Sequence, residues 1–146
     1  MAQVQFTIYT ALGEGFSTVE FIYMNRKNQL CFVEAKSSSP IQQHNPERFE
    51  EWVSEIVAKF CDSLQLFLTV FLQRREETEF GNAIQLANMK ELPMKFILVL
   101  PRHEPDWLAP IQNELSKQLY KINKLWGIQA AVMNEELAKE FGMIAL

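Results

Sequence analysis

The feature that most constrains the fold of this chain is residues 30–40, an apolar run that ends abruptly in polar residues. β-prone side chains dominate residues 30–36, which predicts a strand buried over much of its length, and the polar residues 37–40 predict a loop. Alternation along the strand places Glu34 and Lys36 on one face, two residues apart, where the strand ends. A carboxylate and an ammonium group therefore leave the same side of the sheet.

Two interpretations fit this Glu34-Ala35-Lys36 tripeptide. The simpler one is an ion pair at a strand end. The other is a carboxylate that binds a metal ion, beside a lysine that orients or activates water. A Glu-x-Lys tripeptide occurs by chance in many proteins, so the surrounding elements have to decide between them.

The residues before this strand predict two further strands. Residues 3–10 alternate polar and apolar side chains, which predicts a half-buried strand, and residues 17–24 predict a second one with Glu20 on one face. Residues 25–28 form a polar turn before the strand at residues 30–36. The second and third strands are therefore expected to form an antiparallel hairpin.

A long helix is predicted after the loop. Asn45-Pro46-Glu47 combines a preferred N-cap, a proline suited to the first helical position and an acid suited to the positive end of the helix dipole. Apolar residues then recur every three or four positions to about Gln73, which predicts an amphipathic helix. We expect its aromatic stripe, which includes Trp52, Phe60, Phe67 and Phe71, to be core. Residues 74–79 predict a solvated helix end or loop, and residues 80–92 a loop.

The C-terminal third predicts a strand–helix–strand unit followed by a short helix. Residues 94–100 are almost continuously apolar, as in a strand covered on both faces. A helix is predicted over residues 106–125, ended by Gly127, then a strand over 128–133 and a helix over 135–141 capped by Asn134. Such a unit implies a parallel strand pair. The residues expected to face inward from the first of these helices are Trp107, Ile111, Leu115, Leu119, Ile122 and Leu125.

The sequence as a whole predicts a single α/β domain over residues 1–146, with a mixed sheet flanked by helices in the order β-β-β-α-β-α-β-α. The net charge of −4 is unlike that of a small dedicated nucleic-acid binder, although it leaves room for a local basic patch. Cys31 and Cys61 lie in apolar surroundings, which indicates buried thiols and a reducing compartment. With no signal-peptide pattern and no apolar run that could span a bilayer, we expect a cytoplasmic protein.

This order of elements resembles the PD-(D/E)XK nuclease superfamily, which has the restriction-endonuclease-like fold. The hairpin ends in Phe32-Val33-Glu34-Ala35-Lys36, which looks like the (D/E)XK strand of that family, and a long helix and a buried strand follow. The likeness covers about residues 3–100, and its motif lies within residues 20–36.

The resemblance implies a fold, a cofactor and an activity. In the family, metal ions lie between an acid of the preceding strand and the (D/E) carboxylate, and the lysine helps to position or deprotonate the attacking water. Carried over, Glu20 and Glu34 would bind Mg²⁺ (or Mn²⁺), and Glu20, Glu34 and Lys36 would be the catalytic residues. The expected substrate is DNA or RNA. For Glu20, an exposed strand carboxylate remains the alternative interpretation.

The chain also departs from the family pattern. The family's first acid is typically Asp, often after Pro, whereas Val19-Glu20 stands here, with Glu14 as a weaker substitute. The family core usually begins with a helix, whereas this chain begins in a strand. The alternative function is therefore a catalytically inactive, nuclease-like binding or assembly module. Because no helix covers the apolar face of the first strand (Val4, Phe6 and Ile8), we expect a homodimer or a partner chain that supplies the missing helix.

Three further sets of polar residues have a simple and a functional interpretation. His44 and His103 are expected to be solvated loop histidines, because their spacing is not that of a zinc site. Residues 37–39, three serines, offer hydroxyl groups to a phosphate or simply form a polar loop. Lys117, Lys121 and Lys124 share one helix face, which is either solvated or suited to a phosphate backbone.

Overall fold

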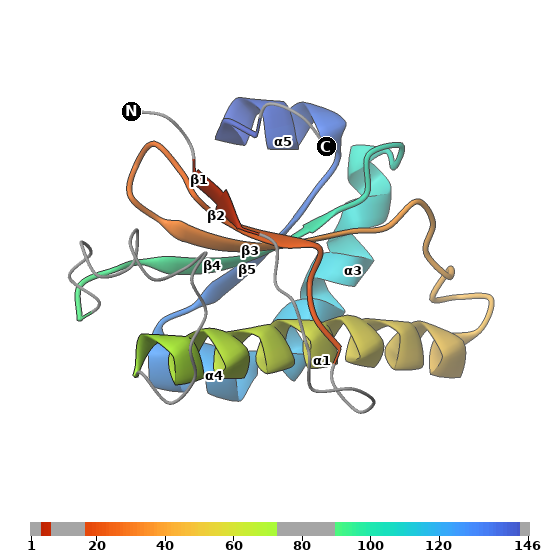
Figure 1. Cartoon of the computed structure of the whole chain (residues 1–146). Helices are drawn as coiled ribbons and strands as arrows, with labels where there is room; N and C mark the ends of the chain where they lie inside the picture. The colour runs from red at the N-terminus through yellow and green to blue at the C-terminus, as the bar shows by residue number, and fades with distance from the viewer. Residues whose placement is uncertain (1–3, 7–16, 73–89, 144–146) are drawn as a thin grey trace.

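The computed structural model describes residues 4–6, 17–72 and 90–143. Within them, a five-stranded sheet has the order β1-β2-β3-β4-β5 and carries helices on both faces (Figure 1). The predicted α/β class with a mixed sheet is confirmed. The strands are β1 (Val4–Phe6), β2 (Phe21–Met24), β3 (Leu30–Ala35), β4 (Met94–Val99) and β5 (Gln129–Met133). The helices are α1 (Pro46–Phe71), α3 (Pro105–Gln118), α4 (Tyr120–Trp126) and α5 (Glu135–Phe141).

The sheet is antiparallel on one side of β3 and parallel on the other. β1, β2 and β3 pair antiparallel, with Phe21 opposite Val33, and β3, β4 and β5 pair parallel, with Val33 opposite Ile97. The predicted hairpin forms around Asn25, whose side-chain oxygen accepts hydrogen bonds from the backbone N–H groups of Lys27 (3.0 Å) and Gln29 (2.8 Å). The carboxyl ends of β3, β4 and β5 therefore meet at one edge of the sheet.

Helix α1 begins where its sequence signals predict. Asn45 caps it through a hydrogen bond from the backbone N–H of Arg48 to Asn45 Oδ1 (3.1 Å), and Pro46 is the first helical residue. The helix ends at Phe71, close to the predicted end. It lies on the same side of the sheet as α3 and α4, whereas α5 lies on the other side (Figure 1). The crossover from β3 through α1 to β4 and the crossover from β4 through α3 to β5 have the same hand. They therefore place α1 and α3 on the same face of the sheet.

The main core fills the space between the sheet and the helices α1 and α3. Phe60 of α1 stacks on Phe96 of β4 with ring centroids 4.6 Å apart, and Phe32 of β3 meets Phe96 edge-on at 5.5 Å. Trp52 is 6% exposed, and Phe60 and Phe67 are fully buried. The aromatic stripe of α1 is therefore core. The sheet and α3 cover these three rings, as expected for core residues.

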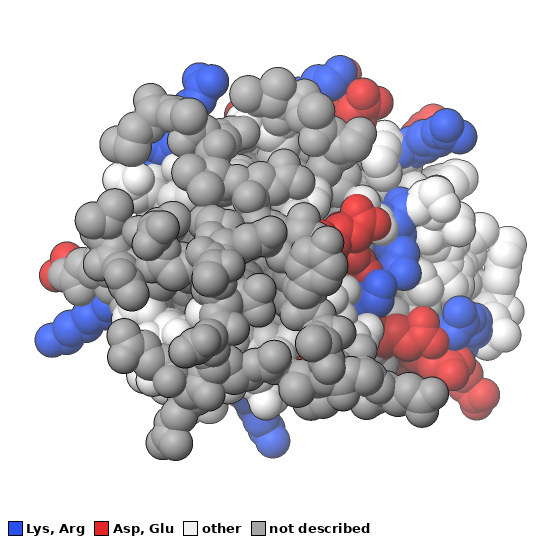
Figure 2. Space-filling view, in the orientation of Figure 1, with Lys and Arg blue, Asp and Glu red and all other residues white. Residues whose placement is uncertain are grey.

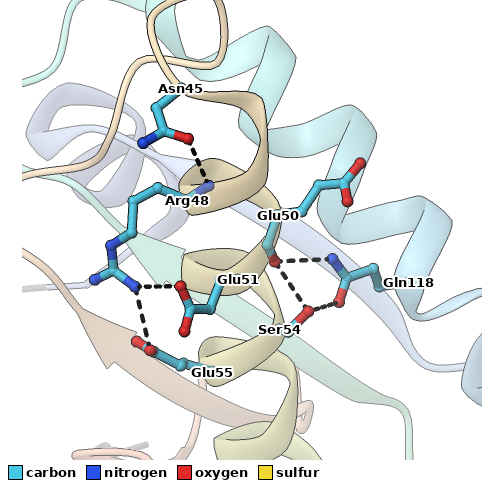
Figure 3. Close-up of polar contacts among 7 residues, drawn as sticks. All are labelled: Asn45, Arg48, Glu50, Glu51, Ser54, Glu55 and Gln118. Atoms are coloured by element: carbon cyan, nitrogen blue, oxygen red, sulfur yellow. Dashed lines mark hydrogen bonds and ion pairs between the residues drawn. The ribbon is translucent and has the colours of Figure 1, made fainter.

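Helices α1 and α3 are also joined by polar contacts on their outer side. Ser54 Oγ donates a hydrogen bond to Gln118 Oε1 at 3.0 Å, and Gln118 Nε2 donates one to the backbone oxygen of Glu50 at 3.4 Å (Figure 3). These contacts join the N-terminal half of α1 to the last turn of α3.

The opposite face of the sheet has a smaller core under α5. Cys31, Val33 and Ile97 are fully buried there, and Ala138 of α5 packs on them. Asn134 caps α5 by accepting a hydrogen bond from the backbone N–H of Leu137 at 2.9 Å, as predicted. The alternation of β3 thus sends Leu30, Phe32 and Glu34 to one layer and the intervening residues to the other.

Several predicted details are wrong. β2 begins at Phe21 rather than at residue 17. The helix predicted over residues 106–125 is broken at Leu119 into α3 and α4, so the order of the elements in the described residues is β-β-β-α-β-α-α-β-α. None of the residues of α4 is fully buried, although Ile122, predicted to face inward, is half-buried and packs against the main core. Trp107 and Leu125, expected inward, are 60% and 80% exposed, because the buried stripe of α3 runs through Leu108 instead.

Some predictions fall outside the described residues: those for Ile8, Glu14, residues 74–79 and most of residues 80–92. Among the helices that the structure describes, none is both long enough and apolar enough to cross a membrane.

Candidate functional site

The candidate site is built around Glu34, which lies near the end of β3. Leu30 and Phe32 precede it on the same face of the strand and are fully buried against α1. The two-residue period carries Glu34 into the same layer, where its side chain is only 1% exposed. A buried carboxylate is costly unless charged or hydrogen-bonding groups compensate it, so its neighbours decide what it does.

Two lysines compensate this carboxylate from different elements. Lys59 of α1 places Nζ 2.5 Å from Glu34 Oε2, and Lys36, just beyond β3, places Nζ 3.9 Å from the same oxygen. The lysine side chains are 27% and 33% exposed, so their ammonium groups reach the edge of the buried layer. Within the described residues, Glu34 Oε1 accepts no hydrogen bond. One carboxylate oxygen is therefore held by ammonium groups, while the other is buried without a hydrogen-bond donor among the described residues.

Glu20 lies across the hairpin from Glu34. Its backbone N–H donates a hydrogen bond to the carbonyl oxygen of Val33 at 3.1 Å, which continues the β2–β3 pairing by one residue beyond Phe21. The side chain is exposed. Partial burial raises the pKa of Glu20, the negative charge of Glu34 raises it further, and Lys59 and Lys36 oppose the shift. The fold thus brings Glu20, Glu34 and Lys36 into one electrostatic cluster.

Lys59 is the member of this cluster that the sequence analysis missed. It lies beside the buried stripe of α1, between Ile56 and Phe60, and interrupts it with a cation. This position could have been recognised from the sequence as that of a lysine with a polar partner. A lysine at the edge of a buried stripe often extends its stem along apolar surface toward such a partner. The partner itself depends on how α1 packs across β3.

The donor set suits a hard divalent cation. Both acids offer carboxylate oxygens, the buried Oε1 of Glu34 has no hydrogen-bond donor among the described residues, and the negative charge of Glu34 is close enough to raise the pKa of Glu20. The described residues contain no group of three or more His, Cys, Asp and Glu side chains that could hold a metal. Mg²⁺ is commonly held by one or two carboxylates with water and substrate phosphate, so a pair of acids fits it.

A hollow of about 400 Å³ opens beside Lys36. We call it the lysine hollow; its walls are Lys36, residues 37–40, Arg48, Trp52 and Glu55. The Arg48 guanidinium does not stand free at its rim, because Nη1 contacts Glu51 Oε2 at 3.3 Å and Glu55 Oε1 at 3.4 Å (Figure 3). Lys36, whose ammonium group lies 3.9 Å from Glu34 Oε2, is therefore the more loosely paired of the two cations on this rim.

The surface around the start of α1 is mixed in charge. Positive and negative side chains lie side by side there, next to an uncharged surface, and do not separate into a basic face (Figure 2). A broad electrostatic footprint for a phosphate backbone is therefore not visible on the described part of this face.

The remaining polar residues weighed in the sequence analysis lie elsewhere. His103 is half-buried and its Nε2 forms a hydrogen bond of 2.8 Å with Ser39 Oγ, so it is not a free loop histidine, whereas His44 is exposed. Burial lowers the pKa of His103. The three lysines of the α3–α4 face, Lys117, Lys121 and Lys124, are all exposed.

Comparison with family models, curated proteins and solved structures found no match for this chain.

Proposed function

We propose that this protein is a metal-dependent nuclease of the PD-(D/E)XK type, with a restriction-endonuclease-like fold, which hydrolyses phosphodiester bonds in DNA or RNA. The observation that carries the proposal is the Glu34 carboxylate, 1% exposed, with Lys36 beside it and an oxygen without a hydrogen bond among the described residues. It lies near the carboxyl end of β3, the edge at which open α/β sheets bind ligands. Charged groups kept at such positions at a cost in stability are candidates for function.

Each residue of the cluster has a role that follows from its position. Glu34 and Glu20 would hold Mg²⁺ or Mn²⁺ between two strands of the hairpin. A bound divalent ion would polarise the phosphoryl oxygen and lower the pKa of a water ligand. Lys36, whose ammonium group lies at the mouth of the buried layer, would donate hydrogen bonds that orient the attacking water. Lys59 would compensate Glu34 when the carboxylate has no cation.

The second candidate is a nuclease-like binding or assembly module without catalysis. The contact of 2.5 Å between Lys59 Nζ and Glu34 Oε2 favours it, because an ammonium group at that distance competes with a metal ion for the same oxygen. The compensated Arg48 and the net charge of −4 also favour it. In that case the buried pair ties β3 to α1.

An activity assay separates the two candidates. Purified protein is incubated with single- and double-stranded DNA and RNA in Mg²⁺ or Mn²⁺, with a chelator as control. We expect metal-dependent cleavage that Lys36→Ala lowers by about 10²–10⁴-fold, a typical loss for a positioned proton-transfer group. Lys139→Ala, at an exposed position of α5 on the opposite side of the sheet, is the matched control and should cleave normally.

Two outcomes would contradict the nuclease proposal. The absence of cleavage of any substrate by the wild-type protein would favour the binding module. Full activity in Lys36→Ala would place the chemistry elsewhere. Calorimetric titration with Mn²⁺ tests the ligands separately: we expect binding that Glu34→Gln abolishes and that Glu135→Gln, on the opposite side of the sheet, leaves intact.

The proposal includes a homodimer and a cytoplasmic location. β1 stands at the end of the strand order, and an edge strand can pair with a second copy of the chain. Light scattering should then report about twice the 17.0 kDa chain mass, and a monomer would contradict it. The free, fully buried Cys31, whose pKa burial raises to about 11, supports a reducing compartment.

A further inference from the structure

A second and larger hollow adjoins the candidate site. Its volume is about 660 Å³, within the usual range for small-molecule sites, and it lies between the loop after β3 and the loop after β4. We call it the Trp107 pocket. The residues that line it and carry the argument are Ser39, Ile41, Arg102, His103, Asp106 and Trp107.

Trp107 gives this pocket an open aromatic wall. The side chain is 60% exposed, although most large aromatic residues of the described chain are core. His103 meets it edge-on, with ring centroids 6.1 Å apart and an angle of 88° between the rings. His103 is itself fixed, since Nε2 bonds to Ser39 Oγ at 2.8 Å and its backbone N–H donates to the carbonyl oxygen of Leu100 at 3.1 Å. The indole thus stands beside a fixed ring and still offers open surface.

The charges of the pocket walls balance. Arg102 and Asp106 carry opposite signs, and burial lowers the pKa of His103, which favours the neutral imidazole. The segment 37–45 contains no charged residue. A wall of this kind does not select a phosphate group. It suits a planar, uncharged group that stacks on an aromatic ring and forms hydrogen bonds with hydroxyl and amide side chains.

The Trp107 pocket and the lysine hollow share one wall. Residues 37–40 line both of them, with Lys36 on one side and Trp107 on the other. A molecule seated in the Trp107 pocket therefore lies across a four-residue segment from the cluster of Glu34 and Lys36. When a phosphate of a nucleotide chain lies at Lys36, a neighbouring base of the same chain can reach the Trp107 pocket.

We propose that the Trp107 pocket takes an unpaired nucleobase, stacked on Trp107, next to the phosphate presented at Lys36. The substrate class is then single-stranded nucleic acid or an unpaired region of a duplex. In a double helix both faces of a base are covered by its neighbours, whereas an unstacked base can lie on an aromatic side chain. This inference rests on the proposed nuclease function for the identity of the ligand.

Binding is measured without catalysis. Fluorescein-labelled single-stranded DNA and RNA of mixed sequence, and the matching duplexes, are titrated with the full-length protein in a chelator, and fluorescence anisotropy is read. We expect both single strands to bind more tightly than the duplexes. Trp107→Ala should weaken single-strand binding by about 5–150-fold, the range for one stacked base. Trp107→Phe should bind within threefold of wild type, as roughly expected when an aromatic face is kept.

Trp126→Ala is the matched control. Trp126 is 46% exposed on α4 and does not line the pocket, so this variant should bind like wild type. Equal binding by Trp107→Ala and wild type, or preference for duplex, would overturn the inference even if the protein cleaves nucleic acid. A change of mass in light scattering for Trp107→Ala, with binding unchanged, would make Trp107 a protein contact instead. Conversely, Trp107-dependent binding without any cleavage would support the pocket and reject the nuclease.

Discussion

Replacement of Lys59 by methionine tests the electrostatics of the candidate site most directly. Methionine keeps much of the stem of the side chain but removes the ammonium group that lies 2.5 Å from Glu34 Oε2. Removal of one partner of a fully buried ion pair costs about 3–5 kcal/mol. Lys59 is 27% exposed and Lys36 remains 3.9 Å away, so we discount this to about 2 kcal/mol.

Thermal unfolding measures this loss. For a chain of this length, about 2 kcal/mol corresponds to a decrease of roughly 4–8 °C in the unfolding midpoint. The matched control is Lys139→Met, which breaks a pair of 3.3 Å with Glu135 on the surface of α5, where both side chains are more than 60% exposed. That variant should stay within about 0.5 kcal/mol of wild type.

Mn²⁺ adds a second measurement to the same experiment. If Glu34 binds metal, loss of Lys59 removes a competitor for Oε2, so the midpoint of Lys59→Met should rise more steeply with Mn²⁺ than that of wild type. A ligand present at 100 times its Kd stabilises by about 2.7 kcal/mol, enough to offset the substitution. If the unfolding midpoint of Lys59→Met is as close to that of wild type as the midpoint of Lys139→Met, the electrostatic argument is refuted. A lower midpoint without any differential effect of Mn²⁺ would leave a structural ion pair and no metal site.

Two further predictions concern the second acid and the core. The raised pKa of Glu20 means that the folded state binds a proton more readily than the unfolded state, so ionisation of Glu20 costs stability and this cost grows as pH rises through its pKa. Glu20→Gln should therefore be more stable than wild type at pH 7, by less than about 1 kcal/mol because the side chain is exposed, and the gain should vanish near pH 4. Urea unfolding at both pH values checks this, and an equal gain at both would speak against a charge effect. Phe60→Ala removes the ring stacked 4.6 Å from Phe96 and should cost about 3–5 kcal/mol, whereas Leu72→Ala, 64% exposed, should cost less than about 0.5 kcal/mol in the same assay. A similar loss of stability in Phe60→Ala and Leu72→Ala would mean that the aromatic stripe of α1 is not core.

Local signals in the sequence determine much of this fold. Asn45 and Asn134 cap the helices that they predict, and Gly127 ends α4 with φ of 67°, in the left-handed region that favours glycine. The alternation of β3 is also local, and it was sufficient to place Glu34 and Lys36 on one face. Each of these features depends on residues within a few positions of one another, where backbone geometry leaves few alternatives.

Tertiary packing decided the rest. The sequence indicated that Glu34 has a charged neighbour two residues away, but the contact with Lys59 exists only because α1 crosses back over β3. The exposure of Trp107, which the helical period predicted to face inward, likewise follows from where α3 meets the sheet, because Leu108 is buried there instead. The separation of α3 from α4 at Leu119 was also not predicted, because the apolar helical period continues past it to Ile122 and Leu125. Contacts between distant segments depend on the distance and orientation of whole elements, which the pattern within one segment does not encode.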